Sequence, residues 1–296
     1  MSIRKYVMLG ASVVLLAGAG AAAQTVQKGK PNHWGYDFPR SYDAEVAAPD
    51  VHEVHYKDAH VMLMEVSNPP GYVMQMHGHP YPSVFARDSF NPPAGADLTG
   101  VARFLEPGSA RNGQNWAEGP AAKGGQFPAC TSADPQAPHM PANGGAWPLH
   151  FYRVEFVYAD QEDMAAAKAR YANNPQRKEL FENGAIKFVE YTLQPGQAPP
   201  KETMPAVLAF DSTAAFDAVK AVIGPDAGSS TAPKGMVIPR CITANPNFAL
   251  PRATAATGPI HFYGFLFKRV DGTGLEANWR AWYPNMVEMQ KGPLRP

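Results

Sequence analysis

The sequence predicts an all-β protein built from two similar barrel-like units, with few helices. Three observations support this prediction: an internal duplication, short apolar runs broken by proline and glycine, and little helical periodicity. The 296 residues, 45% of them hydrophobic, can bury one large core or two of ordinary size. The 26 basic and 26 acidic side chains balance. No nucleic acid is expected as a partner, because phosphate binding needs a basic surface.

The N-terminus has the pattern of a secretory signal peptide. A basic pair precedes the apolar run 6–17, which is too short to span a bilayer. The run 21–23 offers the small residues that a signal peptidase requires. We expect a signal peptide over 1–23, a mature chain starting near Gln24, and a periplasmic or secreted protein with no membrane span after signal removal. The alternative is an uncleaved membrane anchor.

An internal duplication relates the two halves of the chain. An offset of 125 residues aligns the early part of each copy, and an offset of 111 aligns the later part, so the second copy has a net deletion of 14 residues. A chance match would rarely keep a Pro-Gly pair, a cysteine and a His-Phe-Tyr triplet in order. The aligned pairs are His60–Glu65 with Ala185–Glu190, Pro70-Gly71 with Pro195-Gly196, Pro80 with Pro205, Phe85 with Phe210, Cys130 with Cys241, Pro135 with Pro246, and His150–Tyr152 with His261–Tyr263.

The expected strands and helices follow from local pattern. Short apolar runs, several of them alternating, predict β-strands at Val61–Val66, Val73–Met76, Phe151–Val157, Ile186–Leu193 and Ile260–Phe267. Helical periodicity is confined mainly to Gln161–Tyr171 and Thr213–Val222, and Phe90–Gly125 has the composition of a long surface loop. The predicted organisation is an N-terminal extension, 24–50, a first unit, 51–160, a linker helix, 161–175, a second unit, 176–271, and a tail, 272–296, that packs on a barrel.

Three histidines of the first unit form a candidate metal site. His77 and His79 are two residues apart, so on a strand they project from the same face and can bind one ion together. About sixty residues later, His139 offers a third imidazole. Three neutral imidazoles suit a divalent transition metal (Fe, Zn or Mn), with coordination positions left for water, oxygen or substrate.

These motifs resemble those of the cupin superfamily. Gly71-x5-His77-x-His79 resembles the first half of its first motif, and His139-x3-Asn143 resembles the end of its second motif. The resemblance covers nearly the whole mature chain when both copies are counted. It implies a bicupin, with a jelly-roll barrel per unit and one metal held inside by His77, His79 and His139, and the N-terminal pattern makes this an exported bicupin. The glutamate usual in the family falls here on Ser83 or Val84.

The second copy lacks all three imidazoles. At the positions of His77, His79 and His139 it has Glu202, Met204 and Leu250, while the residues around them persist. Joint loss is expected of a functional unit. The favoured reading is a metal-dependent enzyme (oxygenase, isomerase or lyase type) that acts on a small organic molecule. The alternative is a non-enzymatic ligand-binding or structural cupin with a relict site. A homodimer is left open.

The remaining histidines, acidic groups and cysteines have less specific readings. His150 and His261 occur in both copies and are expected to be buried, hydrogen-bonded framework residues. Arg87, Asp88 and Glu155 are either acid or base groups near the first barrel or solvated charges, and the sequence does not distinguish these alternatives. Cys130 and Cys241 form either one disulfide or two separate buried thiols. Surface or strand-edge positions are expected for His33, His52, His55 and His60.

Overall fold

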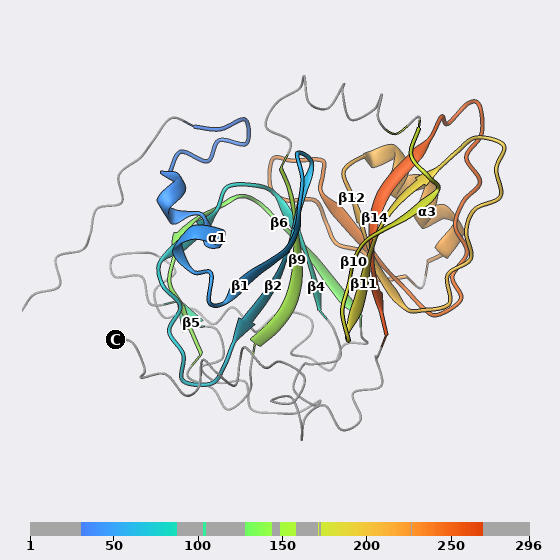
Figure 1. Ribbon diagram of the computed structural model, residues 1–296. Helices are drawn as coiled ribbons and strands as arrows, with labels where there is room; N and C mark the ends of the chain where they lie inside the picture. Colours follow the sequence, from blue (N-terminus) through green and yellow to red (C-terminus); the bar gives the residue numbers. More distant parts are fainter. Residues whose placement is uncertain are drawn as a thin grey trace, which may run out of the picture.

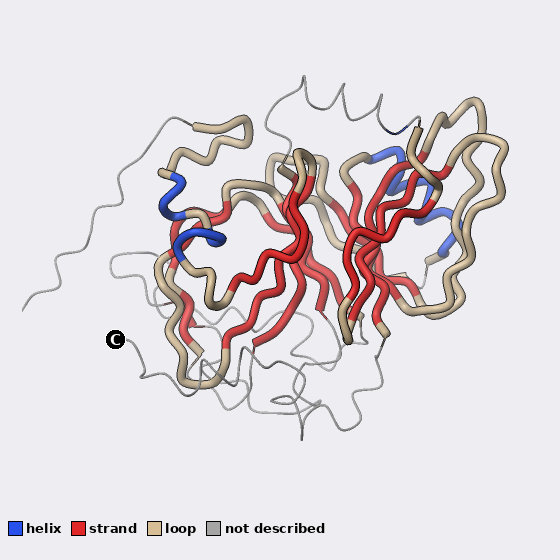
Figure 2. The backbone as a smooth tube through the Cα atoms, in the orientation of Figure 1, coloured by secondary structure: helices blue, strands red, loops and turns tan. Residues whose placement is uncertain are grey.

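The computed structural model describes residues 31–87, 103–104, 128–143, 149–157, 171, 173–225 and 227–268. Within them β-strands dominate, and two antiparallel five-stranded sheets lie side by side (Figures 1 and 2). The prediction of an all-β fold with few helices is confirmed. The expected signal peptide, most of the linker helix and the C-terminal tail lie outside the described residues.

The first sheet has the order β1-β2-β9-β4-β6 and is accompanied by two small two-stranded sheets, β3-β7 and β5-β8. A short strand, β5, lies within the expected long loop and pairs with β8. The elements of the first unit are a 3-10 helix (Arg40–Tyr42), α1 (Ala44–Ala47), β1 (His52–Lys57), β2 (Val61–Asn68), β3 (His77–His79), β4 (Ser83–Arg87), β5 (Arg103–Phe104), β6 (Ala129–Ala133), β7 (Gln136–His139), β8 (Pro141–Ala142) and β9 (Leu149–Phe156).

The second sheet has the order β10-β11-β14-β12-β13. The helix α3 packs against it and follows the expected position closely. Ser212 caps its first turn by accepting a hydrogen bond from the Ala215 amide, and Gly224, with φ of 97°, ends it. The elements of the second unit are β10 (Arg177–Glu182), β11 (Ile186–Leu193), β12 (Ala206–Phe210), α3 (Thr213–Ile223), β13 (Arg240–Ala244) and β14 (Ile260–Phe267).

The two sheets share strand order and register. The edge strands β1 and β10 are irregular at equivalent places, between Val54 and Tyr56 and between Glu179 and Phe181. In both sheets the central pair has the same register, because β2 begins opposite the end of β9 just as β11 begins opposite the end of β14.

One part of the predicted alignment is wrong. The carbonyl of Pro82 accepts from the amide of Phe156, and the carbonyl of Pro205 accepts from the amide of Phe267. Pro205 is therefore the counterpart of Pro82, not of Pro80. Likewise Phe210 is the counterpart of Arg87 rather than Phe85, since Ala86 and Ala209 face the two cysteines. A two-residue deletion before β12 accounts for the shift.

Framework residues recur in both units. His150 Nε2 lies 2.8 Å from Glu65 Oε1, and His261 Nε2 lies 3.1 Å from Glu190 Oε1. All four side chains are buried. The prediction that both histidines are buried, hydrogen-bonded framework residues is confirmed.

The two sheets pack against each other through a shared apolar core. Side chains such as Leu63 and Val154 from the first sheet meet Val207 and Phe265 from the second. A disulfide joins Cys130 on β6 to Cys241 on β13, with their Cα atoms 6.3 Å apart. It resolves the alternative between one bridge and two thiols. The two sheets are thus tied together covalently as well as by burial.

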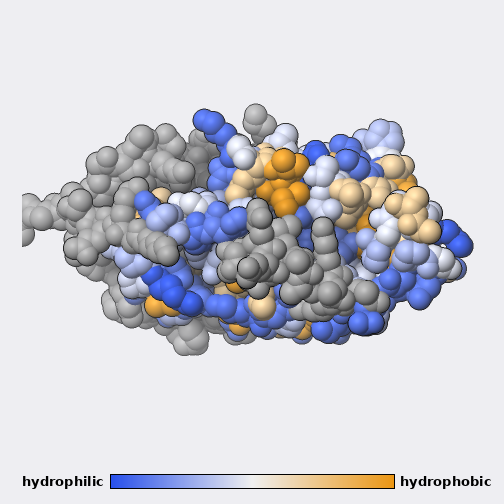
Figure 3. Space-filling model, turned by 90° about the horizontal axis from the view of Figure 1, so that it is seen from above, coloured by the Kyte–Doolittle hydropathy of each residue, from blue (hydrophilic) through white to orange (hydrophobic). Residues whose placement is uncertain are grey.

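The face of the molecule seen in Figure 3 is largely hydrophilic, with separate apolar patches. In the described part of the chain, no helix has the length and apolar character needed to cross a membrane.

Candidate metal centre

The strands β3 and β7 bring the three predicted imidazoles together. His77 pairs directly with His139 across this two-stranded sheet. The ring centroid of His139 is 4.5 Å from that of His77 and 5.5 Å from that of His79, and all three side chains are buried. Pairing of the two motifs therefore brings together imidazoles about sixty residues apart in the sequence.

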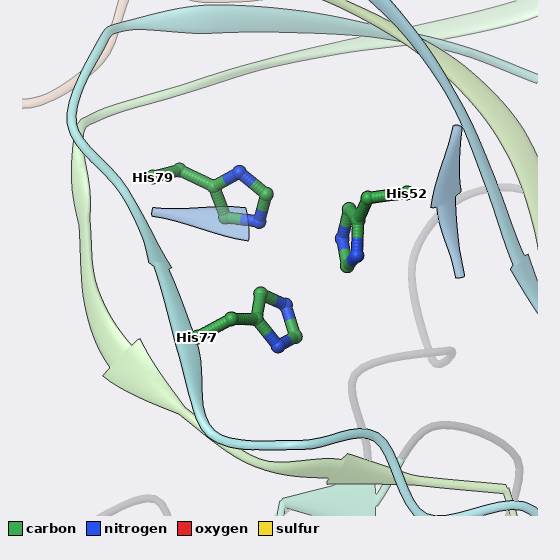
Figure 4. A group of neighbouring side chains, drawn as sticks. All are labelled: His52, His77 and His79. Atoms are coloured by element: carbon green, nitrogen blue, oxygen red, sulfur yellow. The ribbon is translucent and has the colours of Figure 1, made fainter. Parts of the chain in front are cut away.

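A fourth imidazole, that of His52, belongs to the same cluster. His52 lies on the edge strand β1, one of the two positions expected for it, but its side chain is not at the surface, because it is only 3% exposed. It comes from the start of β1, and its ring centroid lies 4.4 Å from that of His77 and 5.2 Å from that of His79. Figure 4 shows the three rings around a common space, with His52 opposite the His-x-His strand. One ring nitrogen of each lies within 4.8 Å of the others.

Backbone carbonyls and a carboxylate fix the orientation of all four rings. An oxygen of this kind can only accept a hydrogen bond, so each Nδ1 must carry the hydrogen and each Nε2 the lone pair. Metal-binding histidines are typically oriented in this way. The Nδ1 atoms of His52, His77, His79 and His139 lie 3.2, 2.7, 2.7 and 2.8 Å from Ala48 O, Gln75 O, Glu155 Oε1 and Ala137 O, respectively.

Burial keeps three of these imidazoles, those of His52, His77 and His79, neutral at physiological pH. Removal from water lowers the pKa of His77 to about 4 and the pKa of His52 and His79 well below the ordinary value. The charge of Arg153 lowers these pKa values further. Neutral imidazole is the form that binds metal.

Glu155 and Arg153 form a buried charged pair behind the rings. Glu155 is fully buried on β9, and this burial distinguishes it from a solvated charge, which the sequence alone does not. Its Oε1 accepts from His79 and lies 3.0 Å from Nε of Arg153. Burial raises the pKa of Glu155 to about 7, although Arg153 opposes the rise. A carboxylate–histidine pair of this kind sets the tautomer and raises the basicity of a ligand.

The rings line a small cavity between the main sheet and the β3-β7 pair. About 30 Å³ of this cavity is open to the centres of water-sized molecules, and roughly 10–15 Å³ on this measure suffices for one water. As bounded by the described residues, it has room for an ion and a small ligand. Its walls are His52, Val66, Met74, His77, His79, Phe85, Gln136, His139, Pro141, Leu149, Phe151 and Arg153.

Gly78, between the two histidines of β3, is required by close packing. A Cβ at this position would clash with the Tyr36 hydroxyl and would lie 3.0 Å from the Gln136 carbonyl oxygen. The N-terminal segment that carries Tyr36 therefore supports the His-x-His strand from outside.

The second unit has an ion pair in the corresponding region. Arg177 and Tyr191 pair across β10 and β11 as His52 and Val66 do across β1 and β2. Nε of Arg177 and the hydroxyl of Tyr191 donate to Oε1 of Glu202 at 2.7 and 2.6 Å. Leu250, the counterpart of His139, packs into an apolar core. At the offset of 125, His52 aligns with Arg177, so this histidine is also absent from the second copy. This shared loss is the signal in the sequence that could have identified His52 as part of the site.

The other histidines lie apart from this cluster. His33 is exposed, as expected, whereas His60 is buried, contrary to expectation. His55 is half-buried and stacks on Phe181, with its Nε2 2.7 Å from Glu65 Oε2. It forms a second group of neighbouring ligand atoms with Glu53 and Glu65. There Glu65 is already occupied by two imidazoles, from His55 and His150.

The donor set of the first cluster fits a transition metal. Nitrogens bound to one zinc ion at 2.0–2.1 Å are at most about 4.2 Å apart, so the 4.8 Å limit on His52, His77 and His79 requires only small adjustments. His139 adjoins the same space. Buried imidazoles of fixed tautomer are ligands for Fe, Zn, Mn and their neighbours.

Comparisons with known proteins give no family assignment. No family model matches the chain, and no curated protein matches it. Among solved structures, AerE from Microcystis aeruginosa is 9% identical with a TM-score of 0.22, over 74% of this chain and 98% of that one. A salicylate 1,2-dioxygenase mutant from Pseudoaminobacter salicylatoxidans, solved with gentisate, is 10% identical with a TM-score of 0.19, over 78% and 72%. TM-scores this low support no argument about fold or activity.

Proposed function

We propose that the first unit binds one divalent transition metal ion and that the protein is a metal-dependent enzyme acting on a small organic molecule. His52, His77 and His79 would hold the ion through their Nε2 atoms, with His139 as a fourth imidazole at the same cavity. The observation that carries the proposal is the convergence of neutral, buried, tautomer-fixed imidazoles on one space.

The second unit provides an internal comparison. Where the imidazoles are absent, the corresponding region holds a partly buried ion pair and packed apolar side chains. If the histidines of the first unit were only structural, we would expect the second unit to have lost some of them and kept others. It has lost all of them together. The shared strand order and bulge position support an origin of both units by duplication and a cupin-like architecture for each.

Each residue of the site has a defined part in this proposal. The imidazoles hold the ion, and Glu155 keeps the proton of His79 on Nδ1. Apolar side chains such as Phe85 and Phe151 exclude bulk water, which strengthens every charge interaction inside. A bound metal ion would supply Lewis-acid or oxygen-activating chemistry.

Export to an oxidising compartment is part of the proposal. The Cys130–Cys241 disulfide supports it, because such bonds persist in a periplasm or outside the cell and are rare in the cytosol of mesophiles. The N-terminal pattern described above is the other support.

Elemental analysis of the purified mature chain tests the metal proposal. We expect about one transition metal ion per chain in the wild type and almost none in His77→Ala or His79→Ala. The exposed His33 supplies a control, since His33→Ala should retain the metal. Stoichiometric metal that survives both site substitutions would reject the site.

The small cavity favours a second candidate, a non-catalytic metal-binding module. Exchange of small ligands at the metal separates the two. In Co²⁺-loaded protein, an enzyme site should change its visible absorption when azide is added, because a coordination position is accessible. An unchanged spectrum would favour the binding module.

A further inference from the structure

Arg153 places a guanidinium group in the wall of the metal cavity. The side chain extends from β9 and is 1% exposed. Nη1 donates to Oε1 of Gln136 at 2.7 Å, and Nε forms an ion pair with Oε1 of Glu155 at 3.0 Å. The guanidinium carbon lies 4.7 Å from the centre of the Phe85 ring. The third nitrogen, Nη2, is buried and has no hydrogen-bond partner among the residues that the structure describes.

A buried donor on a charged group is costly to leave unsatisfied. Buried polar groups are normally hydrogen-bonded, and an exception calls for an explanation such as a missing ligand. Nη1 is held by a hydrogen bond to Gln136 and Nε by the ion pair with Glu155, so the orientation of the guanidinium is fixed before any ligand arrives. An acceptor that enters the cavity beside the imidazoles would satisfy the third arm.

The charge balance of the cavity favours an anion. Imidazole ligands bring no negative charge to an ion, and the charges of Arg153 and Glu155 cancel when both are ionised. If the proposed divalent ion is bound, its charge is not compensated by any described residue in the cavity wall. Bound ions dominate the local electrostatics of such sites. This step rests on the proposed function, whereas the unsatisfied Nη2 does not.

Arg153 is lost in the second unit together with the imidazoles. The offset of 111 sets Gly264 against Arg153 and Leu266 against Glu155, and pairing of β11 with β14 confirms this register. A side chain at Gly264 would press on the Tyr191 ring. By contrast, the framework pair of His150 with Glu65 is kept as His261 with Glu190. Arg153 and Glu155 are therefore absent from the second unit together with the imidazoles, whereas the framework residues are kept.

We propose that Arg153 is an anion-binding residue and that the substrate of this site is a small carboxylate. One carboxylate oxygen would accept a charge-assisted hydrogen bond from Nη2, next to the imidazoles. A cavity of about 30 Å³ restricts the part of the substrate bound there to a few atoms besides the ion. The planar carboxylate of a two- or three-carbon acid fits this limit better than tetrahedral phosphate.

Acetate and acetamide form a matched pair of probes, nearly equal in shape and different in charge. The mature chain loaded with Co²⁺ is titrated with each, and with inorganic phosphate, by visible absorption. We expect acetate to bind at least about tenfold more tightly than acetamide, and more tightly than phosphate. Arg153→Met should remove the preference for acetate, and Arg153→Lys should retain part of it. Tighter binding of phosphate than of acetate would contradict the carboxylate assignment.

A second variant guards against misfolding of Arg153→Met. Gln136→Glu keeps the arginine but supplies an internal carboxylate to the guanidinium, so it should weaken acetate binding about tenfold. Co²⁺ content and the melting temperature are measured for each variant. Equal acetate affinity in the wild type and in folded, Co²⁺-loaded Arg153→Met or Gln136→Glu overturns the proposal.

Failure of the metal site would be recognised separately. If the wild type takes up no metal, the acetate titration is repeated on the metal-free chain and followed by melting temperature. Anion binding by Arg153 without a metal would be supported if acetate, but not acetamide, raises the melting temperature of the wild type and this effect is lost in Arg153→Met. No stabilisation of the wild type by acetate would overturn it.

Discussion

Glu155 Oε1 accepts the Nδ1 hydrogen of His79 at 2.7 Å, and both side chains are almost wholly buried. The carboxylate thereby turns Nε2 of His79 toward the cavity. The Nδ1 atoms of the other three rings face backbone carbonyls, whereas the Nδ1 partner of His79 is a side chain that can be replaced.

Glu155→Gln should weaken metal binding by about 10- to 100-fold without abolishing it. The amide oxygen can still accept from His79, but the charge that raises the basicity of the ring is lost. Competition against a chelator of known affinity measures the effect. Unchanged metal affinity would mean that Glu155 pairs with Arg153 but does not influence His79 as a ligand.

His52→Ala should lower metal affinity as strongly as His77→Ala, because the two rings face the same space. His55→Ala, three residues further along β1, is the matched control and should keep the metal. Metal content after dialysis decides between them. Retention by His52→Ala and loss by His55→Ala would place the metal at the Glu53–His55–Glu65 group instead.

Gly78→Ala should impair metal binding by displacing the His-x-His strand, since the added methyl group meets the Tyr36 hydroxyl. That hydroxyl has no hydrogen-bond partner among the described residues, so Tyr36→Phe alone should be nearly neutral. The double variant should regain part of the metal affinity, because the clash with the Tyr36 hydroxyl is removed. Recovery should be incomplete, because the close contact with the Gln136 carbonyl remains. Additive losses, with no rescue, would contradict the packing explanation.

The metal-free protein should lose stability as the pH falls from about 6.5 to about 4. His77 has a pKa of about 4 in the folded protein and near 6.5 in the unfolded chain, so the unfolded chain binds more protons in this window. The contribution of each such imidazole is therefore constant above pH 6.5, and below it stability declines by up to about 1.4 kcal/mol per pH unit for each imidazole. Glu155, whose pKa is raised to about 7, contributes in the opposite direction above its unfolded value.

Comparison with His77→Gln isolates the contribution of one imidazole. Chemical unfolding of both proteins across this pH range should show a shallower slope for the variant. Parallel slopes would indicate that His77 is solvated in the folded state.

Removal of the disulfide by Cys130→Ser together with Cys241→Ser should lower the free energy of unfolding by about 2–4 kcal/mol, because the bridge closes a long loop of the unfolded chain. Denaturant unfolding with and without reductant measures this effect. Metal content should not change, since the bridge lies between the two sheets and not at the cavity. An unchanged unfolding midpoint would contradict the assigned role.

The sequence was most informative where residues pair in a repeated framework. The strands Ile186–Leu193 and Ile260–Phe267 were predicted with their observed bounds, because buried central strands are continuous apolar runs. Edge strands such as β1 and β10 were missed, because their half-exposed residues lack alternation.

His52 was missed for the same reason. Its role depends on a β1–β2 pairing that local pattern did not show, and only the substitution by Arg177 in the second copy signals it. Glu155 and Arg153 were obscure because their importance comes from burial. A charged residue inside an apolar strand can be recognised in the sequence, but its partners 70 or more residues away, such as His79, are supplied by the fold.

The most direct test of the central claim is an anomalous difference map at a metal absorption edge, from crystals of the metal-loaded mature chain. One strong peak is expected about 2.0–2.2 Å from Nε2 of His52, His77 and His79. A peak at Glu53, His55 and Glu65, or no peak between the three imidazoles in a chain shown to be loaded, would contradict it.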